Sequence, residues 1–489
     1  MTPSHPSGPN RPYWALLALI VLLLLPSGTA DVVLGGAVAV AGAVSLLRVA
    51  GSRRRAAGTG RSEHAVVLGA DAAGAPVVLG DRQLSAHGLI LGASGAGKST
   101  TLLAILTDHI RRGRPVIALD MKGSPAFART LADAAAAAGR EFRLWSPDGP
   151  RRWNPLQHGN ATELKDKLIS TERFTEPHYQ RAAERYVQLA LQVLHEVDPD
   201  RPASLDRVVS LMDPQRLATM VRHLPGERAA HVEDYLAGLT PDQVSAVRGL
   251  GTRLAIISES HTGAFLRPGE DAVDLPAALE GRQVVLFSLN SSIYGKLSAQ
   301  LGTLAIQDLV TASGHRLDHT RDAEVPQALV GIDEFSALGG DNVIALLARG
   351  RESGVSVLLA TQELADLDRA GRGLRDQVLG VTAVKIAHRQ DVPASAQTIA
   401  QMAGTTKIWE PTYQIGRGPF GRYDTSRGTR RAVEQFVVHP NEIKSLKTGQ
   451  AVMITKVPGA QVRTVRVAAP APASARGPAP ARRDGPELA

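Results

Sequence analysis

Residues 92–99 read Gly92-Ala93-Ser94-Gly95-Ala96-Gly97-Lys98-Ser99, and this stretch decides the fold. It follows a short apolar run, Gly88–Leu91, and precedes a segment with helical spacing of apolar residues over about 98–112. The pattern G-x-x-x-x-G-K-[ST] between a strand and a helix is typical of a phosphate-binding loop. Glycines let the backbone amides turn inward around phosphate oxygens, and the helix start adds positive potential. The stretch therefore predicts a nucleotide site in an α/β fold.

The side chains at the end of this loop have separate expected roles. We expect Lys98 to reach the β- and γ-phosphates of ATP and the hydroxyl of Ser99 to ligate Mg²⁺. The predicted nucleotide contacts are Gly92, Ala93, Ser94, Gly95, Ala96, Gly97, Lys98, Ser99 and Thr100.

A second apolar run, Ala328–Asp333, ends in two consecutive carboxylates. We expect Asp333 to hold Mg²⁺ through water and Glu334 to orient and deprotonate the water that attacks the γ-phosphate. Acidic pairs after apolar runs are common, so a solvated turn is the alternative. The phosphate loop makes the catalytic interpretation the favoured one.

Two further residues complete the predicted catalytic set. Gln362 follows the apolar strand Ser356–Thr361, where its amide could sense the γ-phosphate; a surface amide is the alternative. Arg351 is predicted to reach the γ-phosphate of a neighbouring subunit, because arginine pairs bidentately with phosphate, with Arg349 as the reserve. A salt bridge at a helix end is the other interpretation of Arg351.

Strands and helices alternate on both sides of the loop, which favours a largely parallel sheet with helices on both faces. The predicted strands are His64–Gly69, Ala75–Gly80, Gly88–Leu91, Val116–Asp120, Phe142–Trp145, Gln283–Ser288, Ala328–Asp333, Ser356–Thr361, Ala383–Ala387, Ala451–Lys456 and Gln461–Val467. Residues 160–265 lose strand character, so we predict an inserted helical domain. The expected divisions are a membrane hairpin and basic linker (1–62), a nucleotide-binding domain in two parts (63–159 and 276–467), an all-α insertion (160–275) and a disordered Pro/Ala-rich tail (468–489).

Composition limits the possible functions. Apolar residues make up 44% and charged residues 21% of the 489 residues, which excludes a disordered or collagen-like chain. Because the chain has no cysteine, disulfide scaffolds, thiol catalysis and cysteine-based metal sites are excluded. The net charge of +8 resembles that of nucleic-acid-binding proteins. More than half of it lies in residues 1–62, however, which have Arg11, Arg48, Arg53, Arg54, Arg55 and Arg61 against Asp31.

The amino-terminal segment predicts two membrane helices. Apolar runs at Tyr13–Leu25 and Val32–Leu47 are flanked by arginines on their outer sides. The positive-inside rule then gives a hairpin with both ends, and the catalytic body, in the cytoplasm. A cleaved signal peptide ending near Ser27–Ala30 is the alternative, in which case the second run still anchors the body.

A glycine- and arginine-rich stretch near the carboxyl end is predicted to be a loop. Residues 407–431 have six basic and two acidic side chains, and we expect this stretch to be either a DNA-facing pore loop or a solvated basic loop. Its basic residues are Lys407, Arg417, Arg422, Arg427, Arg430 and Arg431.

These features together resemble the type IV secretion coupling proteins of the TraG/TraD kind, within the FtsK–HerA group of hexameric motor ATPases. The phosphate loop and the carboxylate pair match in order. Further matches are Asp120-Met121-Lys122-Gly123, Trp153-Asn154-Pro155-Leu156, Glu176-Pro177-His178-Tyr179, Thr361-Gln362 and the closing segment Asn441–Lys456. The resemblance implies a RecA-like P-loop sheet with an all-α insertion, in a hexamer anchored in the bacterial inner membrane.

The resemblance also implies a function that the spacing of residues alone does not give. Such proteins receive a relaxase–DNA complex and use ATP to drive DNA into a secretion or conjugation channel, whose subunits are further expected partners. Position does not settle the role of Lys122, for which a structural salt bridge is equally plausible. Two alternatives stay open: an FtsK-like chromosomal DNA translocase, and a non-catalytic ATP-binding anchor or cargo receptor.

Overall fold

The protein is described by a computed structural model that covers residues 65–470, except 173, 282, 320–325, 339 and 419–420. The side chains of 318–319, 341 and 413–429 are also outside the description. The predicted membrane hairpin and the tail from 471 onward therefore lie outside the described residues. Among the described helices, none combines the length and hydropathy required to span a bilayer.

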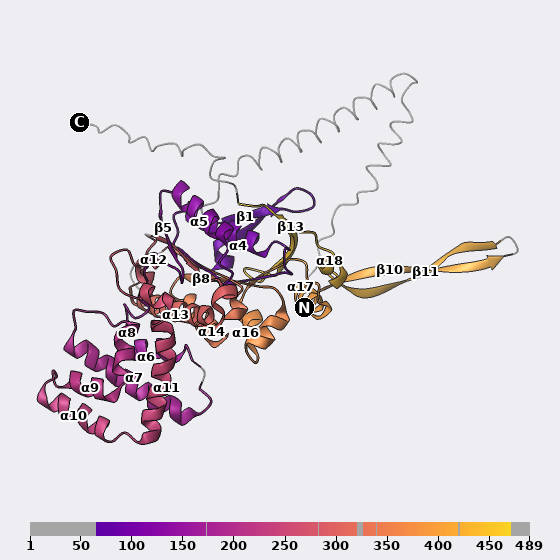
Figure 1. The fold of residues 1–489 in the computed structure, drawn as a ribbon. Helices are drawn as coiled ribbons and strands as arrows, with labels where there is room; N and C mark the ends of the chain where they lie inside the picture. Colours follow the sequence, from indigo (N-terminus) through magenta and orange to yellow (C-terminus); the bar gives the residue numbers. More distant parts are fainter. Residues whose placement is uncertain are drawn as a thin grey trace, which may run out of the picture. The chain divides into compact units, whose positions relative to one another are not determined.

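The described strands form a mixed sheet in the order β2-β1-β13-β12-β9-β3-β8-β7-β4-β6-β5 (Figure 1). Neighbouring strands run parallel from β9 to β5, and the β2-β1-β13-β12 edge is antiparallel. The strands are β1 (Ala65–Ala70), β2 (Pro76–Gly80), β3 (Gly88–Leu91), β4 (Val116–Asp120), β5 (Glu141–Trp145), β6 (Gln283–Ser288), β7 (Ala328–Asp333), β8 (Val355–Thr361), β9 (Val384–Ala387), β12 (Gln450–Thr455) and β13 (Gln461–Val467). The prediction of a largely parallel sheet is confirmed.

Helices cover both faces of the sheet, so the central strands are buried on both sides. In β4, Val116 and Ala118 belong to the core under α4 (Lys98–Arg111) and α5 (Pro125–Ala137), whereas Ile117 and Leu119 face the opposite core. That second core is shared with α13 (Ser291–His319), α14 (Gly340–Gly350), α15 (Leu364–Ala370), α16 (Leu374–Val381), α17 (Pro393–Ala403) and α18 (Pro440–Lys444). Strands buried on both faces read as continuous apolar runs, which is the pattern of this sequence.

Gly331 lies in the middle of β7 where a branched apolar residue would be expected. A Cβ atom placed on Gly331 would meet Leu106 and Leu102 of α4 at 3.0–3.2 Å. The glycine therefore lets the helix that follows the phosphate loop lie close against the strand that carries Asp333.

A block of helices is inserted between β5 and β6, as the sequence predicts. It contains α6 (Ala161–Ile169), α7 (Pro177–Val197), α8 (Leu205–Leu211), α9 (Pro214–Val221), α10 (Gly226–Ala237) and α11 (Pro241–Ser258). Figure 1 shows these magenta helices as a lobe beside the sheet. The amphipathic helix α7 buries Tyr186, Val187 and Leu194 among others at the centre of the lobe. The chain then returns to β6 through η1 (His261–Phe265) and α12 (Leu275–Leu279).

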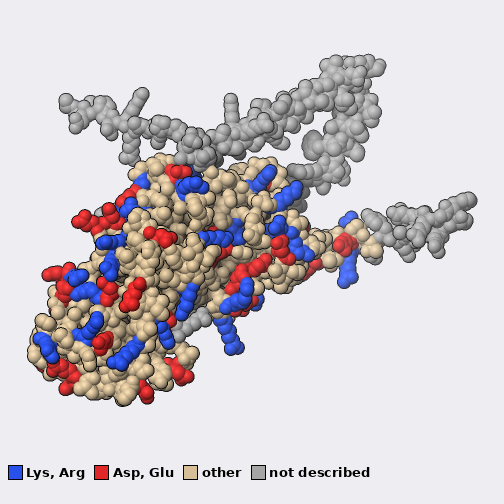
Figure 2. Space-filling view, viewed as in Figure 1, with Lys and Arg blue, Asp and Glu red and all other residues tan. Residues whose placement is uncertain are grey.

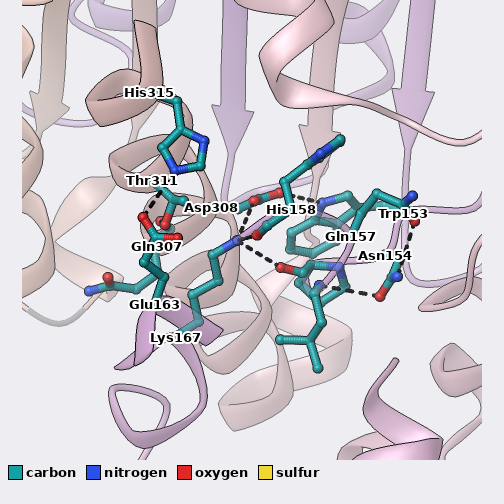
Figure 3. Close-up of polar contacts among 12 residues, drawn as sticks. Trp153, Asn154, Gln157, His158, Glu163, Lys167, Gln307, Asp308, Thr311 and His315 are labelled. Atoms are coloured by element: carbon teal, nitrogen blue, oxygen red, sulfur yellow. Dashed lines mark hydrogen bonds and ion pairs between the residues drawn. The ribbon is translucent and has the colours of Figure 1, made fainter. Parts of the chain in front are cut away.

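The lobe is joined to α13 by a buried polar cluster (Figure 3). Lys167 of α6 lies 2.8 Å from Asp308 of α13, and the indole nitrogen of Trp153 donates to the other oxygen of Asp308 at 3.0 Å. Lys167 also donates to the carbonyl oxygens of Pro155 and His158. The Trp-Asn-Pro-Leu element quoted above is thus the connection between the lobe and the body.

The prediction of a loop at 407–431 is wrong. This stretch lies in a long antiparallel ribbon of β10 (Thr405–Gly418) and β11 (Gly421–Phe436), which extends away from the sheet in Figure 1. Opposite charges face each other across the stem, Lys407 with Glu434 and Glu410 with Arg431, and such pairs stabilise antiparallel strands. Three of the glycines that suggested a loop, Gly416, Gly418 and Gly421, lie in the last described pairs of the ribbon.

Candidate active site

The predicted site residues follow strands that end at one edge of the sheet. In the register of the parallel strands, Leu91 pairs with Thr361 and with Ala387, and Asp333 pairs with Asp120. The segments after β3, β4, β7, β8 and β9 therefore meet at the carboxyl edge, where open α/β sheets bind their ligands.

The phosphate loop has the backbone geometry that its glycines require. Gly95 and Gly97 adopt positive φ angles of 72° and 118°, and α4 begins directly after Gly97. A Cβ on Gly97 would also meet His388 at 3.2 Å and Gly449 at 3.3 Å. The loop is held by two backbone hydrogen bonds, from Ala93 N to Arg389 O and from Gly449 N to Ala96 O, both 2.9 Å.

Lys98 is folded into the concave side of this loop. Its ammonium donates to the carbonyl oxygens of Gly92 at 2.7 Å and Ala93 at 3.4 Å, and the residue is only 4% exposed. Burial, and next the positive charge of Lys122, hold the pKa of Lys98 below its usual value. A phosphate group would supply the negative charge that this ammonium lacks.

Ser99 and Asp333 are 234 residues apart in sequence and lie in direct contact. The hydroxyl of Ser99 donates to Oδ2 of Asp333 at 2.6 Å. Oδ1 of Asp333 is buried and has no hydrogen-bond partner among the described residues. A hydroxyl and a buried carboxylate with a free oxygen form a donor set that suits Mg²⁺, which prefers oxygen ligands.

Glu334 lies beside this pair and accepts two hydrogen bonds on one oxygen. Oε1 receives Gln362 Nε2 at 2.6 Å and Lys122 Nζ at 2.8 Å. Glu334 adopts left-handed backbone angles of φ 56° and ψ 45°, which are uncommon for a residue other than glycine. Glu334 is the residue immediately before η3 (Phe335–Ala337).

Asp120, at the end of β4, shapes the turn that carries Lys122. Its two carboxylate oxygens accept the backbone N–H groups of Lys122 at 2.9 Å and Ser124 at 2.6 Å. Burial raises the pKa of Asp120, with the neighbouring charge of Asp333 acting in the same direction. Asp120 therefore has a structural role that the sequence motif alone does not reveal.

His388 is a buried residue of the site that sequence reasoning missed. Its Nδ1 donates to the carbonyl oxygen of Gln450 at 2.9 Å, and its Nε2 accepts from the hydroxyl of Thr101 at 2.8 Å. This neutral imidazole links α4 to β9 and β12 directly behind the loop. The available signal was position: His388 follows β9, which pairs with the strand before the phosphate loop.

Arg351 does not join the site of its own subunit. It is exposed just before β8 begins, at the amino-terminal ends of the parallel strands, whereas the nucleotide site lies at their carboxyl ends. It lies near Asp81, Arg82 and Gln327. The structure thus brings together Lys98, Ser99, Asp333, Glu334 and Gln362, and places Arg351 away from them.

Buried histidines predict a loss of stability in mild acid. Burial lowers the pKa of His388 and of His87 to about 4 and that of His109 to about 3, against an ordinary value of 6.5. The unfolded chain therefore binds more protons below pH 6.5, and stability falls from there toward pH 4. At pH 5.5 we expect a loss of about 1.4 kcal/mol per histidine, measured by urea denaturation against pH 7.5. In a His388→Gln variant, the loss of unfolding free energy between pH 7.5 and pH 5.5 should be smaller by the contribution of one histidine. The same loss as in the wild type would contradict a role for His388 in this pH dependence.

Fold and site together define a P-loop NTPase. Two family models match the sequence: residues 327–448 match TraG-D_C, described as the TraM recognition site of TraD and TraG, and residues 47–116 match the FtsK/SpoIIIE family. No match was found among curated proteins.

Solved structures share the fold at low sequence identity. The bacterial conjugative coupling protein TrwBdeltaN70, in its unbound monoclinic form, has a TM-score of 0.57 at 15% identity over 83% of this chain and 89% of that chain. TrwB in complex with ADP and Mg²⁺ has a TM-score of 0.54 at 16% identity over 84% and 91%. VirB4 of Thermoanaerobacter pseudethanolicus has a TM-score of 0.54 at 14% identity over 84% and 97%. With the two family matches, this confirms the resemblance to TraG/TraD-like coupling proteins of the FtsK–HerA superfamily.

Proposed function

We propose that this chain is a membrane-anchored hexameric ATPase that couples ATP hydrolysis to the transfer of DNA into a type IV secretion or conjugation channel. The observation that carries the proposal is the contact between Ser99 and Asp333, which joins the phosphate loop to the carboxylate pair. The match of residues 327–448 to TraG-D_C favours a coupling protein over a chromosomal translocase.

The residues of the site have distinct roles in hydrolysis. Lys98 and the loop amides bind the phosphates. Ser99 and Asp333 would hold Mg²⁺, which would neutralise charge on the triphosphate. Glu334 orients a water molecule and accepts its proton. The water oxygen forms a bond to the γ-phosphorus, and the bond from that phosphorus to the bridging oxygen of ADP breaks. Gln362, already bonded to Glu334, holds the carboxylate toward the water.

The position of Arg351 supports a ring of subunits. It lies at the edge of the sheet opposite the nucleotide site and is exposed. In a head-to-tail ring, the surface of one subunit that carries Arg351 would face the nucleotide site of the next subunit. Arg351 would then reach the γ-phosphate bound by that neighbour. This placement supports the ring of subunits that we propose; the number six comes from the family resemblance.

DNA contact is assigned to the β10–β11 ribbon. Figure 2 shows basic and acidic side chains interspersed over the viewed face of the described body, so that face has no broad area of one charge. The sequence of the two ribbon strands, by contrast, has six basic and three acidic residues. A two-stranded ribbon is marginally stable on its own, which fits an element that gains a partner, here the phosphate backbone of DNA.

The remaining parts of the proposal concern the membrane and the partners. The apolar runs before Arg48 would anchor the body on the cytoplasmic side of the bacterial inner membrane. A relaxase–DNA complex is the proposed cargo, and the channel subunits are the proposed neighbours in the membrane. A TraM-like relaxosome protein is a candidate partner for residues 327–448.

DNA-stimulated ATP hydrolysis by the purified full-length chain tests the proposal. We expect turnover by the wild type to rise several-fold on addition of single-stranded or double-stranded DNA. We expect Lys98→Ala to have no measurable turnover, because the loop then lacks its phosphate-binding ammonium. A wild-type oligomer that binds ATP but hydrolyses none, with or without DNA, would instead support a non-catalytic anchor or cargo receptor.

A further inference from the structure

Lys122 is a second ammonium at the nucleotide site. Its Nζ lies 2.8 Å from Oε1 of Glu334, the residue proposed to accept the proton of the attacking water. Its positive charge also reaches Lys98, whose pKa it helps to lower. Lys122 therefore interacts electrostatically with both Lys98 and Glu334, and its ammonium lies near both residues.

The backbone of Lys122 is held by hydrogen bonds, whereas its side chain is partly exposed and contacts one carboxylate, that of Glu334. Asp120 accepts the backbone N–H groups of Lys122 and Ser124. Gly123 has a positive φ of 68° and packs so tightly against Asn290 that a Cβ would meet it at 2.7 Å. The side chain of Lys122 is 40% exposed, against 20% for Glu334. The backbone of Lys122 is therefore fixed, and its side chain is partly exposed to solvent.

Electrostatics keep Lys122 charged. Burial acts to lower its pKa, but the hydrogen bond with Glu334 and the charges of Asp333, Glu334 and Asp120 outweigh burial and raise it. Lysine binds phosphate as a compact point charge, and its flexible stem lets the ammonium change partners. An incoming triphosphate would offer Lys122 a partner with more negative charge than one carboxylate.

We propose that Lys122 binds the γ-phosphate of ATP, exchanging its contact with Glu334 for one with the terminal phosphate. The inference rests on the proposed function and deepens it, because it names the group that distinguishes ATP from ADP at this site.

The γ-phosphate, and not the α- or β-phosphate, is the expected partner because of what surrounds Lys122. Lys98 and the loop amides occupy the side of the site next to α4. Lys122 contacts Glu334, the residue proposed to orient the water that attacks the terminal phosphorus. The exchange would also leave Oε1 of Glu334 available to that water. Binding of the γ-phosphate by Lys122 would therefore free the carboxylate of Glu334 to contact the attacking water.

The test is a comparison of ATP and ADP affinity, made in a Glu334→Gln background so that ATP is not consumed. Fluorescent ATP and ADP analogues with Mg²⁺ are titrated into the full chain with and without Lys122→Met. We expect Lys122→Met to weaken binding of the ATP analogue about tenfold and to change binding of the ADP analogue less than about twofold. Lys122→Arg, which keeps the charge, should recover most of the ATP affinity.

Each result has a defined meaning. A Lys122→Met variant that binds both analogues as tightly as its parent, or loses both equally, would overturn the inference and leave Lys122 as a structural partner of Glu334. Lys456→Met, an exposed lysine just after β12, is the matched control and should change neither affinity. Failure of the parent protein itself to bind either analogue would contradict the proposed function, and the two failures are thus distinguishable.

Discussion

Replacement of Glu334 by Gln is expected to lower the turnover of ATP by about 10²–10⁴-fold, the usual contribution of a positioned general base. The change removes the group that accepts the water's proton but keeps the size of the side chain. Gln362 and Lys122 lose the negative charge of their partner, but a side chain of the same shape stays beside them. ATP binding should persist, because Lys98, Ser99 and Asp333 are untouched, so the variant should accumulate in the ATP-bound state.

The measurement is steady-state phosphate release by the full-length chain, together with the affinity for an ATP analogue. Glu270→Gln, which alters an exposed glutamate between η1 and α12, is the matched control and should retain wild-type turnover. Wild-type turnover in Glu334→Gln would show that another group accepts the proton. Loss of ATP binding in that variant would show that Glu334 supports the fold of the site more than its chemistry.

Replacement of Asp308 by Ala is expected to lower the free energy of unfolding by about 3–5 kcal/mol. Lys167 is 1% exposed and Asp308 5% by side chain, so removal of the carboxylate leaves an ammonium buried without its countercharge. The indole N–H of Trp153 also loses its acceptor (Figure 3). Because this cluster joins the helical lobe to α13, the loss should loosen the attachment of the lobe.

A double variant separates the ion pair from the other contacts of Asp308. Lys167→Met combined with Asp308→Asn removes both charges and keeps an oxygen for Trp153, so it should lose less stability than Asp308→Ala alone. Asp200→Ala, at an exposed site of the lobe, should stay within about 0.5 kcal/mol of wild type. Urea denaturation of the full chain supplies these values. If Asp308→Ala were as stable as Asp200→Ala, the buried ion pair would contribute nothing.

Sequence reasoning succeeded where a local pattern has a single structural meaning. The phosphate loop and the apolar runs gave strands within a residue or two of those observed, for example Ala328–Asp333 for β7. The meeting of Ser99 with Asp333 also followed, because parallel strands place their carboxyl ends at one edge.

It failed where the outcome depends on contacts between distant residues. The β10–β11 ribbon has glycine and arginine in proportions typical of a loop, and only the cross-strand pairing makes it a ribbon. His388 gives no sign in sequence of its hydrogen bonds to Thr101 and Gln450. The pairing of Lys122 with Glu334 joins two motifs whose order in the chain says nothing about their distance.

DNA transfer from a donor strain tests the central claim most directly. The chain's gene is deleted in frame and complemented by wild type or by Lys98→Ala, and recipients that acquire the DNA are counted. The account predicts that wild type restores transfer and that Lys98→Ala, present in the membrane at the same level, does not. Transfer at the wild-type level in Lys98→Ala cells would contradict an ATP-driven motor.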